Sequence, residues 1–178
     1  MSIPLTCVTG RFQPVHGDHL RLFELALASC ERLVIGVTNP DPGTLRAETG
    51  SDHRHLGAAN PFTFYERLEL LTAALGPAPV GRVLFVPFDL GRPEHWASYV
   101  PLHAVQYVGV YGPWEREKAR RLAAGGYEVV EVPGDERTRR TSTAIRAALR
   151  TGRGWQALVP PATVAPLTAL LAGRATPL

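Results

Sequence analysis

The chain has 178 residues, 45% of them hydrophobic and 20% charged, and a formal net charge of +3 at pH 7. This composition is typical of a soluble globular protein, and we expect a single domain over residues 1–178 with a helical subregion at about 141–178. No segment approaches the roughly 18 uncharged apolar residues of a membrane span, and the N-terminus lacks the features of a secretory signal. We therefore expect a cytoplasmic protein without membrane contact, in which Cys7 and Cys30 are reduced core thiols.

The basic residues gather in two groups late in the chain. The first group consists of Arg116, Lys118, Arg120 and Arg121, and the second consists of Arg137, Arg139, Arg140, Arg146 and Arg150. A solvated helix face is the favoured interpretation of the first group. The second group would suit a small polyphosphate at least as well as nucleic acid, because no RNA-binding motif or interleaved aromatic accompanies it. Charge alone does not choose between these ligands, and nucleic acid is the less favoured partner.

The first half of the chain alternates between strand and helix patterns. We expect, in order, a strand at 5–9, a helix at 18–30, a strand at 32–38, a helix at 60–75 and a strand at 83–86. The strands are short apolar runs, and the helices repeat apolar residues at intervals of three or four. Asn60 is the expected cap of the second helix, with Thr63 and Glu66 spaced as an alternative capping box. The polar connection 39–59 is long for a compact domain, which is typical of functional loops.

The second half continues the alternation and ends in helices. We expect a short helix at 96–100, a strand at 105–111, a helix at 115–124, a strand at 127–132, a helix from Thr141 or Ser142 to Leu149, and a last apolar segment at 164–171. Alternation of this kind predicts a doubly wound, Rossmann-like α/β fold with a parallel sheet of about five strands and a small helical C-terminal end. In such folds, ligands bind beyond the carboxyl ends of the strands.

The segment between the first strand and the first helix, Gly10 to His19, carries two histidines. Glycine lets a backbone approach a ligand, and the N-terminus of a helix attracts anions. Because His16 and His19 are three residues apart, they would project to one side of a helical turn and could stabilise a phosphoryl group during transfer. A zinc site is the less favoured alternative, since no third ligand lies nearby in the sequence. One capping and one surface histidine is the other alternative.

A second polar segment opens the late helix. Thr141, Ser142 and Thr143 bring hydroxyls to its start, and Arg146 follows one turn later. Together with the free N–H groups of the helix, these side chains would form a seat for the outer phosphates of a nucleoside triphosphate. Ordinary helix capping remains the alternative, because Ser and Thr begin many helices.

Taken together, the two segments resemble a known family. The pattern G-R-F-Q-P-x-H-x-x-H, from Gly10 to His19, and the pattern T-S-T-x-I-R, from Thr141 to Arg146, are similar to motifs of the HxGH nucleotidyltransferase superfamily. The archaeal-type nicotinamide-nucleotide adenylyltransferases are the nearest subgroup by these patterns. Further similar motifs follow in family order between Cys7 and about Leu171, which is nearly the whole chain.

The resemblance implies a reaction and a set of residue roles. An acceptor phosphate would attack the α-phosphorus of ATP or CTP, with Mg2+ carried by the triphosphate rather than by protein ligands, and pyrophosphate would leave. The implied catalytic residues are His16, His19, Arg11 and Arg146. The implied nucleotide-binding residues are Gly10, Arg11, Phe12, His16, His19, Thr141, Ser142, Thr143 and Arg146. The implied acceptor-binding residues are Phe62, Trp96, Trp114 and Asn39. Relatives in this superfamily assemble into multimers, so the resemblance also leaves a homo-oligomer open.

Within this resemblance, Trp96 would stack on the ring of the acceptor. A half-buried anchor of a short helix is its alternative interpretation. Trp114 would be either a second stacking surface or a contact at the start of a helix, and the two interpretations stay open.

Several departures from the family pattern cluster around the base and the acceptor. Asp18 stands where the family has a glycine before the second histidine, and the loop 39–59 is longer than in the archaeal enzymes. This loop contains His53 and His55, for which a solvated loop is favoured over metal binding. The family's Gly-Asn-Pro after the fourth strand is replaced here by residues 112–114, Gly-Pro-Trp. The sequence therefore specifies the reaction type better than the substrate.

Three functional hypotheses follow. The leading one is adenylyl transfer from ATP to nicotinamide mononucleotide, which gives NAD. The second is cytidylyl or adenylyl transfer to another small phosphate or phosphonate acceptor. The third is a nucleotide-binding regulator without turnover, in which Arg137, Arg139 and Arg140 contact nucleic acid.

Overall fold

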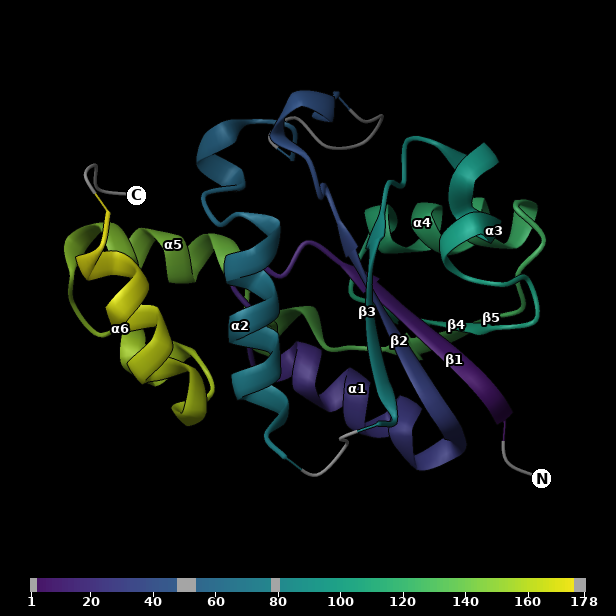
Figure 1. The fold of residues 1–178 in the computed structure, drawn as a ribbon, viewed down its shortest axis with the longest axis horizontal. Helices are drawn as coiled ribbons and strands as arrows, with labels where there is room; N and C mark the ends of the chain where they lie inside the picture. Colours follow the sequence, from purple (N-terminus) through teal and green to yellow (C-terminus); the bar gives the residue numbers. More distant parts are fainter. Residues whose placement is uncertain (1–2, 48–53, 78–80, 175–178) are drawn as a thin grey trace.

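A five-stranded parallel sheet forms the centre of the structure, a computed structural model that describes residues 3–47, 54–77 and 81–174. The strands are β1 (Ile3–Gly10), β2 (Cys30–Thr38), β3 (Val83–Phe88), β4 (Val105–Val110) and β5 (Val129–Pro133). They lie in the order β3-β2-β1-β4-β5, with β1 in the middle (Figure 1). The order reverses between β1 and β4, and this reversal opens the crevice in which doubly wound sheets bind ligands. The expected Rossmann-like fold is confirmed.

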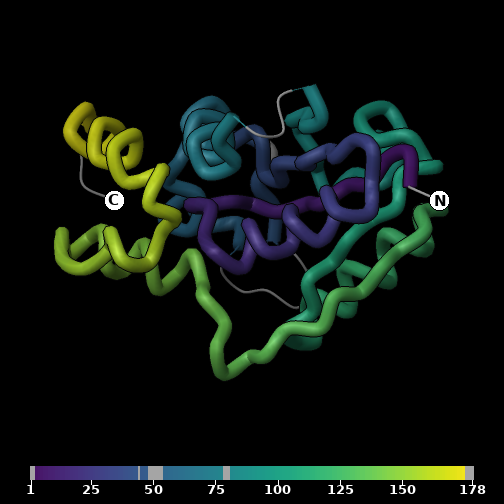
Figure 2. The backbone as a smooth tube through the Cα atoms, turned by 90° about the horizontal axis from the view of Figure 1, so that it is seen from below, coloured from purple at the N-terminus to yellow at the C-terminus, as the bar shows by residue number. Residues whose placement is uncertain are grey.

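Helices cover both faces of the sheet. They are α1 (Gly17–Ser29), α2 (Phe64–Leu75), α3 (Trp96–Tyr99), α4 (Pro113–Ala124), α5 (Ser142–Thr151) and α6 (Val164–Ala172). One face packs against α1, α2 and the C-terminal helices, and the other packs against α3 and α4. The C-terminal helices α5 and α6 lie at the opposite end of the molecule from the start of β1, as Figure 2 shows. Among the described residues, no helix is both long enough and apolar enough to span a membrane.

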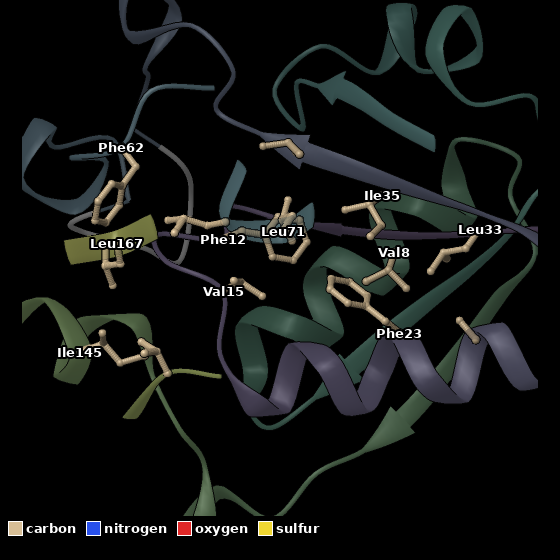
Figure 3. Close-up of a cluster of buried hydrophobic side chains, with 14 of the residues drawn as sticks. Val8, Phe12, Val15, Phe23, Leu33, Ile35, Phe62, Leu71, Ile145 and Leu167 are labelled. Carbon is tan, nitrogen blue, oxygen red and sulfur yellow. The ribbon is translucent and has the colours of Figure 1, made fainter. Parts of the chain in front are cut away.

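The two faces of the sheet have separate apolar cores. Successive side chains of a strand point to opposite faces, so β2 contributes Leu33 and Ile35 to one core and Val34 to the other. Phe23 of α1 packs on the first face beside Val8 and Ile35 (Figure 3). Because both faces are covered, β1 and β2 contain continuous runs of buried residues, at 5–9 and 33–38, rather than alternating buried and exposed positions.

The start of α2 differs from the expected boundary. Thr63, not Asn60, is the N-cap: its hydroxyl accepts from the Glu66 backbone N–H at 3.2 Å, and the Glu66 carboxylate accepts from the Thr63 N–H at 2.7 Å. The Asn60 amide donates instead to the carbonyls of Arg54 and Leu56. The alternative capping box is therefore confirmed, and the connection before α2 is three residues longer than a cap at Asn60 implied, since the cap is Thr63 and α2 begins at Phe64.

Candidate active site

A cleft of about 600 Å³ lies over the carboxyl end of β1, at the reversal between β1 and β4. Its wall is built by the end of β1, the start of α1, the start of α4, and the segment that joins β5 to α5. The predicted nucleotide-binding residues that line it are Gly10, Arg11, Phe12, His16, His19, Thr141, Ser142 and Thr143. The fold therefore brings residues from both sequence motifs to one cavity.

Direct hydrogen bonds join the two motifs. The Arg140 backbone N–H donates to the Asp18 carboxylate at 2.9 Å, and the Ser142 hydroxyl donates to the Pro14 carbonyl at 3.1 Å. Arg146 donates from its guanidinium to the Gln13 carbonyl at 2.8 Å. These three contacts fix the start of α5 against the loop that leads into α1, so the two helix N-termini share one cavity.

The two histidines form a stacked pair at the start of α1. Their ring centroids lie 3.7 Å apart with an interplanar angle of 26°, and the Phe12 ring stands edge-on to His19 at 4.9 Å. The His16 backbone N–H donates to Nδ1 of His19 at 3.2 Å. In the neutral form His19 therefore carries its proton on Nε2, which makes that nitrogen a donor. Within the described residues, Nδ1 of His16 is buried and has no hydrogen-bond partner.

Both imidazoles are held in the neutral form. Burial lowers the pKa of His16 from 6.5 to about 4, and the guanidinium groups of Arg139 and Arg140 act in the same direction, although Asp18 opposes them. Burial also lowers the pKa of His19 well below its usual range, with His16 and Lys118 as further causes. An anion placed beside these rings would favour the protonated form and raise both pKa values.

Cationic side chains surround the histidine pair. The cations that line the cleft are Arg11, Arg21, Arg54, Lys118, Arg139 and Arg140. The solvated helix face expected for Lys118 is wrong, because this residue is only 8% exposed and its Nζ donates to the Thr9 carbonyl at 2.5 Å. The sequence could have indicated the burial of Lys118, because the buried residues of α4 recur at helical spacing: Glu115, Lys118, Ala119 and Leu122.

Three residues expected at the acceptor are absent from the lining of the cleft. Trp96 is 3% exposed, stacks on Phe88 at 5.6 Å in the core, and donates its indole N–H to the Asp89 carbonyl at 2.8 Å. This placement agrees with the alternative interpretation of Trp96 as the anchor of a short helix. The ring fits because Gly125 faces it, where a Cβ would lie 2.7 Å from the indole.

The other two residues support the wall of the cleft from behind. Phe62 points into the core near Leu167 (Figure 3), and its backbone N–H and carbonyl both pair with the Gln13 side chain at 2.9 Å. The Asn39 amide donates to the Arg54 carbonyl at 3.1 Å. Trp114, the fourth predicted acceptor residue, does line the cleft.

Arg146 also lies behind the cleft rather than in its lining. It is 3% exposed, and besides Gln13 it donates to the Thr143 hydroxyl at 3.1 Å. The expectation that this guanidinium grips a phosphate is replaced by a structural role, because its bonds to Gln13 and Thr143 hold the two motifs together.

Comparison with known proteins agrees with this geometry. A family described as cytidylyltransferase-like matches residues 7–148. The chain belongs to the cytidylyltransferase-like family. A phosphonoformate cytidylyltransferase of Streptomyces viridochromogenes is 39% identical over 87% of this chain and 85% of its own length. A nicotinamide-nucleotide adenylyltransferase of Thermococcus kodakarensis is 31% identical over 85% of this chain and 75% of its own length.

Solved structures share the fold. A bifunctional NMN adenylyltransferase/ADP ribose pyrophosphatase from Francisella tularensis, complexed with AMP and MN ion, superposes with a TM-score of 0.60 at 17% identity. The match covers 88% of this chain and 44% of that longer one. As a member of the cytidylyltransferase-like family, this chain is a nucleotidyltransferase, and its cleft lies where an α/β fold of this kind binds ligands.

In this member of the cytidylyltransferase-like family, Asp18 replaces the glycine that precedes the second histidine in the motif. Its carboxylate accepts from the Arg140 backbone and lines the cleft. Burial raises the pKa of the Tyr111 hydroxyl, and the adjacent Asp18 charge and hydrogen bond raise it further. Asp18 lies in the first turn of α1, whose N-cap is His16. It links α1 to the approach to α5 and to the end of β4.

Proposed function

We propose that this enzyme transfers a nucleoside monophosphate from CTP to a small phosphonate or phosphate acceptor. The observation that carries the proposal is the meeting of two helix N-termini, two neutral imidazoles and six cationic side chains around one cleft. Its volume of about 600 Å³ is ordinary for a small-molecule site. The 39% identical phosphonoformate cytidylyltransferase supports CTP and a phosphonate as substrates.

The proposed chemistry is an in-line displacement at phosphorus. An oxygen of the acceptor forms a bond to the α-phosphorus of the triphosphate, and the bond from that phosphorus to the bridging oxygen breaks. Pyrophosphate leaves with the electron pair. Such a reaction needs positioning and neutralisation of spreading negative charge rather than a covalent bond to the protein. The fixed cations and N–H groups around this cleft are suited to both tasks.

The histidine pair would act as hydrogen-bond donors to the phosphates. The Nε2–H of neutral His19 would point at an oxygen on which charge grows during transfer. Nδ1 of buried His16, for which the described part of the chain supplies no hydrogen-bond partner, offers a second polar atom beside it. Because the His16 ring is buried and the His19 ring is partly buried, each hydrogen bond gained with the transition state is stronger than it would be in solvent.

The triphosphate would bring Mg2+ with it. Among the described residues, no group of three or more His, Cys, Asp or Glu side chains could hold a metal ion. A cleft with a cationic wall fits a metal that is coordinated mainly by phosphate oxygens. When bound, Mg2+ would neutralise charge on the phosphates. Lys118 and the N-termini of α1 and α5 would orient those same phosphates.

Adenylyl transfer from ATP to nicotinamide mononucleotide is the second candidate. The 31% identical nicotinamide-nucleotide adenylyltransferase, which aligns over 85% of this chain, favours it. The buried position of Trp96 argues against it, because the indole N–H and ring are already engaged in the core and do not reach the cleft.

A coupled assay for released pyrophosphate separates these candidates. The four ribonucleoside triphosphates would each be paired with phosphonoformate, nicotinamide mononucleotide and inorganic phosphate. We expect the highest kcat/KM with CTP and phosphonoformate. A higher kcat/KM with ATP and nicotinamide mononucleotide would instead select the second candidate. Tight triphosphate binding without pyrophosphate release for any pair would contradict both and leave the regulator hypothesis.

A further inference from the structure

Arg54 and Trp114 meet inside the cleft although they come from different sides of β1. Trp114 lies in the first turn of α4, after β4, while Arg54 lies in the segment that follows β2. The central carbon of the Arg54 guanidinium stands 3.5 Å from the centroid of the Trp114 ring. Both residues line the cavity. The stacked pair therefore bridges the crevice next to the histidines and Lys118.

The backbone of Arg54 is held in place by several side chains. Its carbonyl accepts from the amide of Asn60 at 2.7 Å, from the amide of Asn39 at 3.1 Å, and from the Arg11 guanidinium at 3.4 Å. Three donors on one carbonyl fix the point from which the Arg54 side chain extends. The guanidinium therefore has a defined approach to the Trp114 ring, unlike a surface arginine on an unconstrained loop.

Buried Arg67 fixes the residues that hold Arg54. It donates to the Arg11 carbonyl at 2.9 Å and to the Asn39 carbonyl at 2.8 Å, so it fixes two of the three residues that hold Arg54. The position of the Arg54 guanidinium in the cleft therefore depends on Arg67 of α2, on Arg11, and on the side-chain amides of Asn39 and Asn60.

The stacked geometry has two chemical consequences. A guanidinium that lies flat on an indole covers one face of it, so a planar ring of a substrate cannot stack on that face of Trp114. Its N–H donors lie in its own plane at the edge of the stack, a geometry suited to a two-point contact with a carboxylate or a phosphonate. The pair would therefore deny an acceptor ring this stacking surface and offer a two-point contact to an acceptor with two nearby anionic groups.

We propose that Arg54, held against Trp114, determines which acceptor this enzyme uses: it selects small, ring-free acceptors that carry two anionic groups. This inference rests on the proposed nucleotidyl transfer and names the acceptor class of the same site. The cationic wall already contains Arg11 and Lys118. A multiply charged anion is the kind of ligand that such a concentration of positive charge attracts.

The test compares two acceptors on matched variants. Wild-type enzyme, Arg54→Ala, Arg54→Lys and Arg120→Ala would be assayed with CTP and either phosphonoformate or nicotinamide mononucleotide. Arg120 is a suitable control because it lies on the same helix as Trp114, its side chain is 76% exposed, and it pairs with Glu117. The measured quantities are the KM for acceptor, the KM for CTP, and the ratio of kcat/KM for the small acceptor to that for the ring acceptor.

We expect Arg54→Ala to raise the KM for phosphonoformate by roughly 10- to 100-fold, as loss of a charge-assisted hydrogen bond should, while the KM for CTP changes less than about twofold. The ratio of specificities should fall by a similar factor. Arg54→Lys keeps the charge but loses the flat stacking surface, so it should fall between wild type and Arg54→Ala. Arg120→Ala should match wild type.

A specificity ratio for Arg54→Ala within about twofold of the wild-type ratio would overturn the inference. So would equal increases in the KM for CTP and for acceptor, since these would place Arg54 on the triphosphate. If Arg54→Ala does not fold, as judged by circular dichroism, the ratio for Arg54→Lys decides in the same way.

If wild-type enzyme turns over neither acceptor, the proposed function fails and calorimetric titration isolates the role of Arg54. Phosphonoformate would be titrated into the wild-type and Arg54→Lys proteins saturated with CTP. Weaker binding to the variant supports the inference, and equal binding overturns it.

Discussion

Arg146 donates a hydrogen bond of 2.8 Å to the carbonyl of Gln13, a residue 133 positions earlier in the chain. The bond joins α5, which contains most of the motif from Thr141 to Arg146, to the loop between β1 and α1, which carries the motif from Gly10 to His19. Because the guanidinium is buried and also holds the Thr143 hydroxyl, it fixes the relative position of both halves of the cleft. Arg146 is a positioning residue in this account.

We expect Arg146→Met to destabilise the fold by about 2 to 4 kcal/mol, because the substitution leaves the buried Gln13 carbonyl without its donor. The free energy of unfolding from urea denaturation measures the effect. Arg150→Met is the control, since Arg150 is an exposed arginine on the same helix. Unchanged stability together with lost turnover would instead place the Arg146 guanidinium on a substrate phosphate.

His19→Ala should lower kcat far more than it lowers affinity for the triphosphate. Removal of one preorganised donor to a developing oxyanion typically costs about 10²- to 10³-fold in kcat. The kcat comes from the pyrophosphate assay, and the Kd of CTP comes from calorimetry. Parallel losses of similar size in both quantities would contradict a role confined to the transition state.

The buried His16 predicts a stability that falls in acid. The pKa of His16 is about 4 in the folded chain against an ordinary 6.5, so the unfolded chain binds more protons between these values. The free energy of unfolding should therefore be highest above pH 6.5 and decline as the pH falls toward 4, by on the order of 3 kcal/mol from His16. Urea denaturation at a series of pH values, repeated on His16→Gln, measures this contribution. A variant whose acid slope equals that of wild type would show that His16 is not its source.

Lys118 should contribute to triphosphate binding. Its ammonium group lies at the carboxyl end of β1, beside the start of α1, where phosphates are expected. We expect Lys118→Met to weaken CTP binding by about tenfold, a typical effect of losing one charge-assisted contact. Arg120→Met, a charge removal on the exposed face of the same helix, should leave the Kd of CTP unchanged. Equal effects of the two substitutions would assign the loss to net charge rather than to the site.

Trp96→Ala should act through the core. The indole packs against Phe88 and Tyr127, so its removal should lower the free energy of unfolding by about 3 to 5 kcal/mol. Trp96→Phe, which keeps most of the packing, should recover much of this stability. Loss of acceptor affinity in a Trp96→Phe enzyme of normal stability would return Trp96 to the acceptor site.

The sequence predicted the fold and the meeting of the two motifs because both follow from general rules of parallel sheets. Alternating strands and helices specify the strand order only in broad terms, but ligands always gather at the carboxyl ends. The sequence could not decide which way a motif residue faces. Trp96 turns inward because Gly125, 29 positions later, leaves space for its ring, and no local pattern reveals such a contact.

Arg54 was missed for a similar reason. It lies in a polar loop without periodicity, and only the three donors that converge on its carbonyl show that its position is specified. His53, which precedes it and was weighed as a metal ligand, lies outside the described residues. The burial of Lys118 could have been predicted from the sequence, because Lys118 falls on the buried stripe of its helix.

Phosphorus NMR of a complete reaction is the sharpest test of nucleotidyl transfer in this cleft. With CTP, Mg2+ and phosphonoformate, the enzyme should produce pyrophosphate and a new phosphoanhydride between cytidine monophosphate and the acceptor in equal amounts, and His19→Ala should slow both signals together. Formation of inorganic phosphate and CDP, or a new phosphoanhydride whose rate is unaffected by His19→Ala, would contradict nucleotidyl transfer in this cleft.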